Sequence, residues 1–457
     1  MSEDKAKILA TRQHEKLKEK LKIWKLIYEA YSGSQAFINK SNLFIYRIED
    51  NLRYEQRLKR ADYTNHVATL IDMIIGFIYS NPVHREIQEG FAYIQNSIYK
   101  GKSLQNFMNM IATNSLKSTV GVLVDSPIIS EMTEAERKLN NINPYVVYYR
   151  PEEICDFEED DTGQLEWIIL DNSYIDKSDP YSKPSEVFNK RLWTKEYYQD
   201  IYMSMDGSKK NYKLGEEYYH DLGQVPFIFV NSRDIDGNNI TDSAFEDIVL
   251  KSRTIFNMNS WASEILASSA FQLLLFPYEN QGDLDNIAEL FNPASGGIGD
   301  LPVIPFKALS QKPSFEAPEI DVDKFIKMIN HLSSEILSKF GLKSEEKGSW
   351  ESGVAKSIDF YKTEAFLKSI STQLEVVEKK IIDLCSLYEN TKIEYKIEYN
   401  KNYEKSDIEK ELKRLESLFK IPSDNLKKEI YKEMARLTLT NKDQNEVEEL
   451  LNDIKGE

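Results

Sequence analysis

The sequence predicts an α+β protein that is mainly helical, and three observations lead to that prediction. Apolar residues recur three or four positions apart through most of residues 1–120, as one buried helix face requires. The same period returns from residue 321 and, after one interruption, forms the longest helical pattern in the chain. Between these parts, β-branched and aromatic residues alternate in short runs that are typical of strands. The 457 residues, 41% of them hydrophobic, are enough for about two to four packed units.

The N-terminal part is predicted to contain helices with recognisable ends. The stretch LRYEQRLKRADYTNHVATLIDMIIGFIYS, residues 52–80, keeps the helical period until Asn81-Pro82 stops it. The period resumes at residue 104, and Ser103 is placed to cap the new helix because its hydroxyl accepts from a free backbone N–H.

A β-rich part is predicted to follow from about residue 118. Residues 191–215 are predicted to form a hairpin or meander with a tight turn at Asp206-Gly207. Four further runs are predicted strands: GVLVD at 121–125, YVVYY at 145–149, LEWIIL at 165–170 and VPFIFVN at 225–231.

Helices are predicted again in the second half, broken by one irregular module and one charged loop. The module holds most of the local prolines and glycines, and the loop GLKSEEKGSWESG separates two helical patterns. In order, the predicted elements are a helix from Asp242, the module at 273–320, a helix at 321–340, the loop at 341–353, the longest helix from Val354, a strand at 392–399 and charged helices at 404–457.

Charge and cysteine content limit the classes of function. The 58 Lys and Arg against 75 Asp and Glu give a formal charge of −17, whereas a protein that coats DNA is usually basic because it must neutralise phosphates. This acidity suits a surface along which DNA slides without sticking, or simple solubility. Cys155 and Cys385 show neither disulfide nor zinc spacing, which indicates a reducing compartment. The charged N-terminus and the short apolar windows predict a soluble intracellular chain.

Motifs of catalysis and of cofactor binding are not found in the sequence. The five histidines form no HExxH or HxH pair, and no glycine-rich phosphate loop or nucleophile elbow occurs. The acidic run DFEEDD at 156–161 is predicted to be a solvated turn, and DIDGNN at 234–239 lacks the ligands of a calcium loop. We therefore expect no enzymatic activity, no cofactor and no metal. A metal-dependent nuclease is the hypothesis that the acidic runs alone would support.

The order of the predicted elements in the second half points to an assembly protein. A helix, a compact module, a second helix, a short charged loop and a very long helix follow one another. A ring-shaped conduit needs this order, because two helices of each subunit form the wall, the module forms one mouth and the loop projects into the bore. The same order also fits any helical protein with an inserted module.

From about Ala30 to Asn400 the chain resembles the portal proteins of tailed double-stranded DNA phages. The resemblance rests on the order and spacing of several segments, none of which is a catalytic signature. These are YEQRLKRADYTNHVATLIDMIIGFIYSNP, TVGVLVDSP, YYRPEEICDFEED, VPFIFVNSRDIDGN, FEAPEIDVDKFIKMINHLSSEILSKFGL and ESGVAKSIDF. The resemblance implies a phage portal fold and a ring of about twelve subunits at one capsid vertex. It also implies that the genome enters and leaves through this ring.

The resemblance also implies a division of the chain into the regions of a portal subunit. The wing would be residues 1–241, helical at first and β-rich from about 118, together with the long helix and strand at 354–403. The remaining regions would be stem helix 1 at 242–272, the clip at 273–320, stem helix 2 at 321–340, the tunnel loop at 341–353 and a helical crown at 404–457.

Candidate site residues follow from this division. The tunnel loop would meet DNA through Lys343, Lys347, Glu345, Glu346, Ser349 and Trp350. Ser338 and Lys339 would line the channel, and Gly341, Gly348 and Gly353 would be hinges. Plain solvation is the alternative role for each lysine. Trp350 would either contact the loop of the next subunit or anchor the start of the long helix.

In the clip, two apolar runs are candidate contacts between subunits or with partner proteins. They are QLLLF and LPVIPF, with Leu273, Leu275, Phe276, Val303, Ile304 and Phe306 as the contact residues. Sheet edges invite pairing with another chain, so these runs would pair across subunits. The alternative is an ordinary sheet inside the module.

The resemblance further implies a location in the virion, after synthesis in the host cytoplasm, and a set of partners. These would be other copies of the chain, the terminase large subunit, a head–tail adaptor protein, the major capsid and scaffolding proteins, and double-stranded DNA bound without sequence specificity. No membrane is expected. The alternative function is that of a non-portal phage assembly protein, a scaffold or tail chaperone, with long helices.

Overall fold

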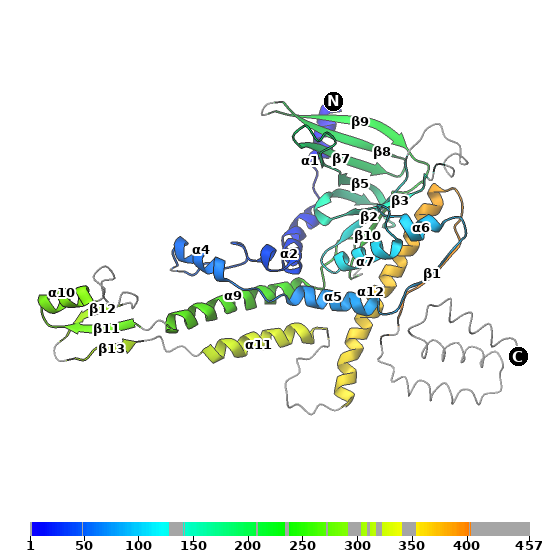
Figure 1. The fold of residues 1–457 in the computed structure, drawn as a ribbon. Helices are drawn as coiled ribbons and strands as arrows, with labels where there is room; N and C mark the ends of the chain where they lie inside the picture. Colours follow the sequence, from blue (N-terminus) through cyan, green and yellow to red (C-terminus); the bar gives the residue numbers. More distant parts are fainter. Residues whose placement is uncertain are drawn as a thin grey trace, which may run out of the picture. The chain divides into compact units, whose positions relative to one another are not determined.

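The computed structural model describes residues 2–47, 49–127, 140, 142–206, 209–233, 237–270, 273–290, 303–308, 311–316, 322–340, 353–401 and 403 (Figure 1). The chain divides into two compact units, residues 1–401 and 402–457, and all elements named below belong to the first.

The N-terminal part is helical, as predicted. Its helices are α1 (Ser2–Thr11), α2 (Glu15–Ser32), α3 (Ser34–Phe37), α4 (Asn51–Arg60), α5 (His66–Ile78), α6 (Ala92–Ser97) and α7 (Leu104–Ser115). The predicted cap is confirmed, because the Ser103 hydroxyl accepts from the backbone N–H of Asn106 at 3.3 Å. The helical period records burial: α5 buries Val67, Leu70, Ile71, Ile74 and Ile78 along one face.

The predicted strands are found in two sheets. One sheet has the order β10-β2-β3 and consists of β2 (Val120–Asp125), β3 (Tyr145–Tyr149) and β10 (Phe227–Val230). All six residues of β2 are buried, which explains its unbroken apolar run.

The second, six-stranded sheet has the order β4-β5-β7-β8-β9, with β6 paired to β7 alone. Its strands are β4 (Ile154–Glu159), β5 (Leu165–Asp171), β6 (Tyr174–Asp176), β7 (Ser185–Thr194), β8 (Tyr197–Asp206) and β9 (Lys209–Tyr219), and the 3₁₀ turn η1 (Pro151–Glu153) precedes them. Helix α1 packs on this sheet, where Ala6 joins a buried cluster with Leu192 and Ile201. The register Asp206↔Lys209 places the predicted hairpin turn between β8 and β9.

The second half alternates long helices with a small module. Its elements are α9 (Glu246–Ala270), β11 (Leu273–Tyr278), α10 (Gln281–Leu290), β12 (Val303–Lys307), β13 (Ser314–Glu316), α11 (Val322–Ser338), α12 (Gly353–Tyr388) and β14 (Tyr395–Glu398). Strands β11–β13 form one sheet (Figure 1), and β14 pairs antiparallel with β1 (His84–Ile87), more than three hundred residues earlier.

The predicted fold class, mainly helical with a phage portal fold, is wrong, because the structure contains more strand than a mainly helical protein. The structure is 45% helical and 25% strand, and the described residues form four sheets. Alternating polar and aromatic residues in 185–219 form strands of ten, ten and eleven residues, longer than the hairpin that the sequence suggested. The module predicted to be irregular also contains strands, since Pro277 lies within β11 and Pro305 within β12 and neither proline prevents the strand from forming. The structure is a mixed α+β arrangement.

Candidate functional site

The helices α9 and α11 lie side by side although the module separates them in the sequence (Figure 1). Two ion pairs join them: Lys339 Nζ lies 2.7 Å from Asp247 Oδ2, and Lys251 Nζ lies 2.7 Å from Glu335 Oε2. Because the numbers rise on one helix as they fall on the other, the two helices are antiparallel.

A shallow cavity of about 400 Å³ lies at this helix pair. Its lining combines charged and apolar groups: Asp247, Ile248, Leu250, Lys251, Glu335, Ile336 and Lys339. The hydrogen bond and charge of Lys339 lower the pKa of the Asp247 carboxyl, and those of Lys251 lower the pKa of Glu335. Each ammonium is thus balanced by a carboxylate on the opposite helix.

Two predicted channel-lining residues, Ser338 and Lys339, are exposed at the C-terminal end of α11. The Ser338 hydroxyl donates to the carbonyl oxygen of Glu335 at 3.0 Å, and Lys339 is held by Asp247. Lys339 therefore offers a neutralised side chain rather than an isolated cation. Its role in lining a channel stays a prediction.

The end of α11 is fixed by an aromatic cluster. The Phe340 ring is 5.3 Å from the Phe245 ring and 5.2 Å from the Phe366 ring. The Thr363 hydroxyl also donates to the carbonyl oxygen of Phe340. These contacts join the end of α11 to α12 and to the residue that precedes α9. The chain therefore enters the predicted loop from a packed position.

Most predicted tunnel-loop and hinge residues lie outside the described part of the chain. They are Lys343, Lys347, Glu345, Glu346, Ser349, Trp350, Gly341 and Gly348. Gly353, the third predicted hinge, is the first residue of α12. The roles assigned to all of these residues stay predictions.

The predicted clip contacts lie in the three-stranded sheet, whose order is β12-β11-β13. Leu273, Leu275 and Phe276 are in β11, and Val303, Ile304 and Phe306 are in β12. These two strands pair with each other in parallel, for example Leu275 with Ile304. Strand β11 is central and uses both its edges, so β12 is the strand of the two that keeps an outer edge for another chain.

Two buried arginines that the sequence analysis missed each join distant segments. Arg85 Nε lies 2.5 Å from Glu378 Oε1, and Tyr399 donates to Glu378 Oε2 at 2.7 Å. Arg57 Nε donates to Glu49 Oε1 at 2.8 Å, and its guanidinium lies 3.9 Å from the Tyr46 ring centre. Its Nη1 donates to the hydroxyl of Ser260, on α9, at 3.0 Å. The position of Arg57 on the apolar face of α4 could have indicated from the sequence that this arginine is buried and paired. The strand β1 has only four residues, and its pattern does not indicate the pairing of Arg85.

A third missed residue is Lys117, which is only 4% exposed. Its Nζ lies 4.0 Å from the Tyr31 ring centre and 4.7 Å from that of Tyr28. Burial lowers the pKa of Lys117 from 10.5 to about 8, although the charge of Asp72 opposes this shift.

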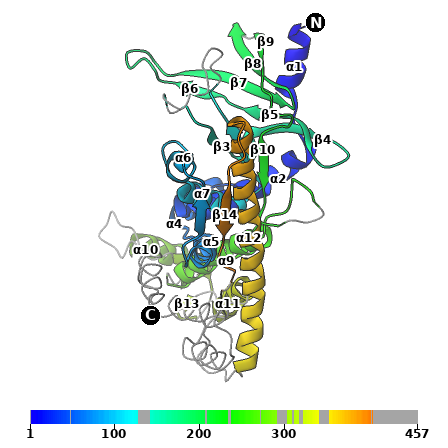
Figure 2. The ribbon, with the colours of Figure 1, turned by 90° about the vertical axis from the view of Figure 1, so that its right-hand side faces the viewer.

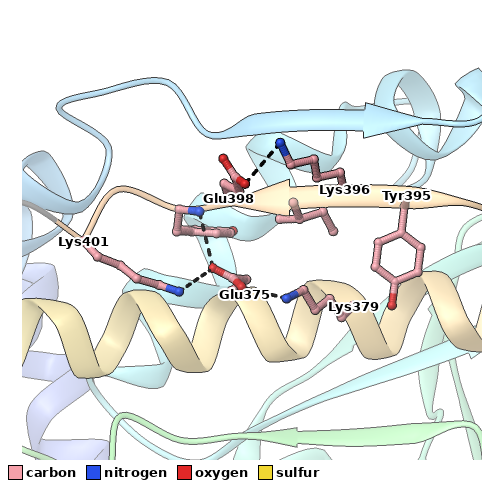
Figure 3. A pocket seen from close by; sticks show the side chains of 8 residues that line it. Glu375, Lys379, Tyr395, Lys396, Glu398 and Lys401 are labelled. Atoms are coloured by element: carbon pink, nitrogen blue, oxygen red, sulfur yellow. Dashed lines mark hydrogen bonds and ion pairs between the residues drawn. The ribbon is translucent and has the colours of Figure 1, made fainter. Parts of the chain in front are cut away.

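A cavity of about 570 Å³ lies between α12 and β14 (Figure 3). Glu375 accepts from Lys379 at 2.7 Å and from Lys401 at 2.9 Å. Lys396 and Glu398, on β14, are 3.2 Å apart. Each of these three lysines has a carboxylate partner, and the pair of Lys401 with Glu375 joins the residues after β14 to the long helix.

Three further features of the described part of the chain concern metal sites, cysteine thiols and membrane-spanning helices. No group of three His, Cys, Asp or Glu side chains there is arranged to hold a metal ion. Cys155 and Cys385 are both buried, and burial raises the pKa of each thiol. No helix among the described residues combines the length and apolar character needed to cross a membrane.

Several solved structures are similar to this chain, and two of them are described below. One is described as "Virion of native gene transfer agent (GTA) particle", with a TM-score of 0.42 and 10% identity, over 89% of this chain and 98% of that chain. The other is described as "Neck of native GTA particle computed with C12 symmetry", with a TM-score of 0.41 and 11% identity, over 80% of this chain and 89% of that chain. At these values neither likeness carries an argument about function. The chain matches no family model and no curated protein.

Proposed function

We propose that the chain is a portal subunit, about twelve copies of which form a ring at a capsid vertex through which double-stranded DNA is packaged and ejected. The observation that carries this proposal is the arrangement of the second half of the chain. Two antiparallel helices, α9 and α11, enclose a separate three-stranded module in the sequence, and the 36-residue α12 follows. The sequence resemblance assigns the same segments to stem, clip and long wing helix.

The electrostatics of the helix pair suit a channel for a polyanion. Free lysines or arginines along the wall would bind phosphates and hold the DNA. In this pair, Lys251 and Lys339 are each neutralised by a carboxylate across the helices. A ring of such subunits, each with a formal charge of −17, would repel DNA on average, and DNA held so weakly could move through it.

The proposed role is structural rather than enzymatic, with ATP hydrolysis assigned to the terminase that docks on the ring. A head–tail adaptor would replace the terminase after packaging, and capsid and scaffolding proteins would surround the ring. The proposal places the chain in the virion. The two similar structures are described as a virion and as the neck of such a particle. The proposal does not depend on those two likenesses.

The first test is the particle that the purified chain forms. We expect native mass spectrometry to give a complex of about twelve subunits and negative-stain images to show rings with a central hole. A stable monomer or dimer at several salt concentrations would refute the portal function. Elongated particles without a hole would favour a scaffold or tail chaperone, which the long helix α12 also suits.

A second test concerns the predicted tunnel loop. Replacing Lys343 and Lys347 by glutamate should leave ring assembly intact and change the length or the yield of packaged DNA, because the two rings of cations would be lost. The matched control is Lys18→Glu with Lys22→Glu, two exposed lysines on α2. If the loop variant packages DNA of the same length and yield as the wild type, these two lysines have no role in packaging.

A further inference from the structure

Two groups of apolar residues are exposed on the surface of this chain. The first, the α4 patch, consists of Phe44, Ile45 and Leu52, which are 46%, 53% and 71% exposed. The second is the β6 arm, residues 171–187, on which Tyr174, Ile175 and Tyr181 are 55%, 60% and 98% exposed. Exposed apolar groups gathered in this way mark interaction surfaces rather than ordinary solvent-facing surface.

The α4 patch is a preorganised receptor. It adjoins a cavity of about 660 Å³ whose lining includes Phe44, Ile45 and Tyr54. The Asn257 side chain accepts from the Phe44 backbone N–H at 2.8 Å, and the Tyr54 hydroxyl donates to the Leu43 carbonyl at 2.7 Å. Together with the buried Arg57, these bonds hold the patch in shape before a partner arrives, which reduces the entropy lost on binding.

The β6 arm has the properties of a ligand for such a receptor. Strand β6 pairs only with β7, so the arm is a two-stranded ribbon at the margin of the six-stranded sheet (Figure 2). A ribbon of two strands gains little stability alone in water. Asp179 accepts from the Tyr181 backbone N–H at 2.9 Å and shapes the tip of the arm. Exposed tyrosines are also the residues that most often anchor an interface by filling a pocket.

Charge favours pairing of these two surfaces. Residues 40–60 contain six Lys or Arg and three Asp or Glu, a net +3, in a chain whose total is −17. The β6 arm contains four Asp or Glu and two Lys, a net −2. DNA fits the α4 patch less well, because four of these six cations already have carboxylate partners: Lys40 with Glu55, Arg53 with Asp50, Arg57 with Glu49 and Arg60 with Glu264.

We infer that copies of this chain join head to tail, with the β6 arm of one copy seated on the α4 patch of the next. Two different surfaces of one chain that fit each other form a heterologous interface, and such an interface closes into a ring when the rotation per subunit allows it. This inference rests on the proposed function, which requires a ring, and adds the surfaces that form it. Tyr181 and Ile175 would fill the cavity beside Phe44 and Ile45.

The test uses two double variants of the full chain. The patch variant carries Ile45→Asp and Leu52→Asp, and the arm variant carries Ile175→Asp and Tyr181→Ala. We expect each alone to lose rings by at least about tenfold in native mass spectrometry, because a buried charge or a missing anchor weakens every contact in the ring. The control, Ile8→Asp, changes an equally exposed apolar residue (58%) on α1 and should assemble as the wild type does.

Mixing the two variants gives the sharper result. The patch variant keeps its arm and the arm variant keeps its patch, so the mixture should form a heterodimer that cannot extend. Rings formed by either variant at the wild-type level, or a mixture without heterodimer, would overturn the inference. If the wild type forms no ring, the proposed function fails, while a heterodimer in the mixture would still support the pairing. Circular dichroism verifies folding, and Tyr181→Ala alone serves as the milder variant if a double variant is unfolded.

Discussion

Replacing Glu378 by alanine is expected to lower the free energy of unfolding by about 3–5 kcal/mol, because a buried guanidinium would lose its counter-ion. The Glu378 side chain is fully buried and that of Arg85 is 10% exposed. The carboxylate accepts two bonds from Arg85, at 2.5 and 2.9 Å, and one from Tyr399 at 2.7 Å. The alanine variant would leave both donors without this acceptor. Urea unfolding at neutral pH measures the effect.

Two controls separate charge burial from general damage. Replacing Arg85 and Glu378 together by methionine should recover most of the loss, since no unpaired charge then remains. Glu398→Ala removes an exposed carboxylate from the same strand as its partner Lys396, at 3.2 Å, and should cost no more than about 1 kcal/mol. A loss below about 1 kcal/mol for Glu378→Ala would show that the buried pair does not hold β1, α12 and β14 together.

Replacing Lys117 by methionine is expected to raise the free energy of unfolding by about 2 kcal/mol at pH 7. The pKa difference between 10.5 and about 8 corresponds to a penalty of about 3 kcal/mol for keeping this ammonium charged in the folded chain. Loss of the contacts with the Tyr28 and Tyr31 rings offsets about 1 kcal/mol of the gain. Methionine retains the length of the side chain and also packs well against aromatic rings.

The pH dependence identifies the cause. Because the folded-state pKa is lowered, the penalty is complete below pH 8 and disappears as the pH rises through 10.5. The advantage of Lys117→Met should therefore shrink by about 2 kcal/mol between pH 7 and pH 9.5. Lys18→Met, at an exposed position of α2, should change stability by less than about 0.5 kcal/mol at either pH. If the gain in stability of Lys117→Met is the same at both pH values, burial does not penalise the charged ammonium of Lys117.

The elements that the sequence predicted well are those whose burial leaves a local period. The long helices α9, α11 and α12 and the strands β2, β3, β5 and β10 appear where periods of 3.6 or 2 were found. The balance of the fold was predicted less well. Strands β7 to β9 carry alternating polar and aromatic residues, since their sheet is only partly buried, and such a pattern is weaker than a continuous apolar run.

In the candidate site too, the sequence predicted positions along the chain but not the contacts between distant residues. Ser338 and Lys339 were predicted at the end of a helix and are found there, but the pairing of Lys339 with Asp247 depends on two helices that the module separates. The contact between Arg85 and Glu378 spans 293 residues. Neither pairing leaves a pattern in its own neighbourhood, because a residue's partner across the fold does not change the period of the residues beside it.

By itself the sequence determined the order of the chain's parts: a helical start, a β-rich middle, two helices around a module and a very long helix. Local hydrophobic period is sufficient for this, because it records which face of each element is buried. Only the tertiary structure decided what each buried face meets. It paired β1 with β14, neutralised the lysines of α9 and α11, and left the α4 patch and the β6 arm exposed. These outcomes depend on distances between segments far apart in the sequence, which local patterns do not encode.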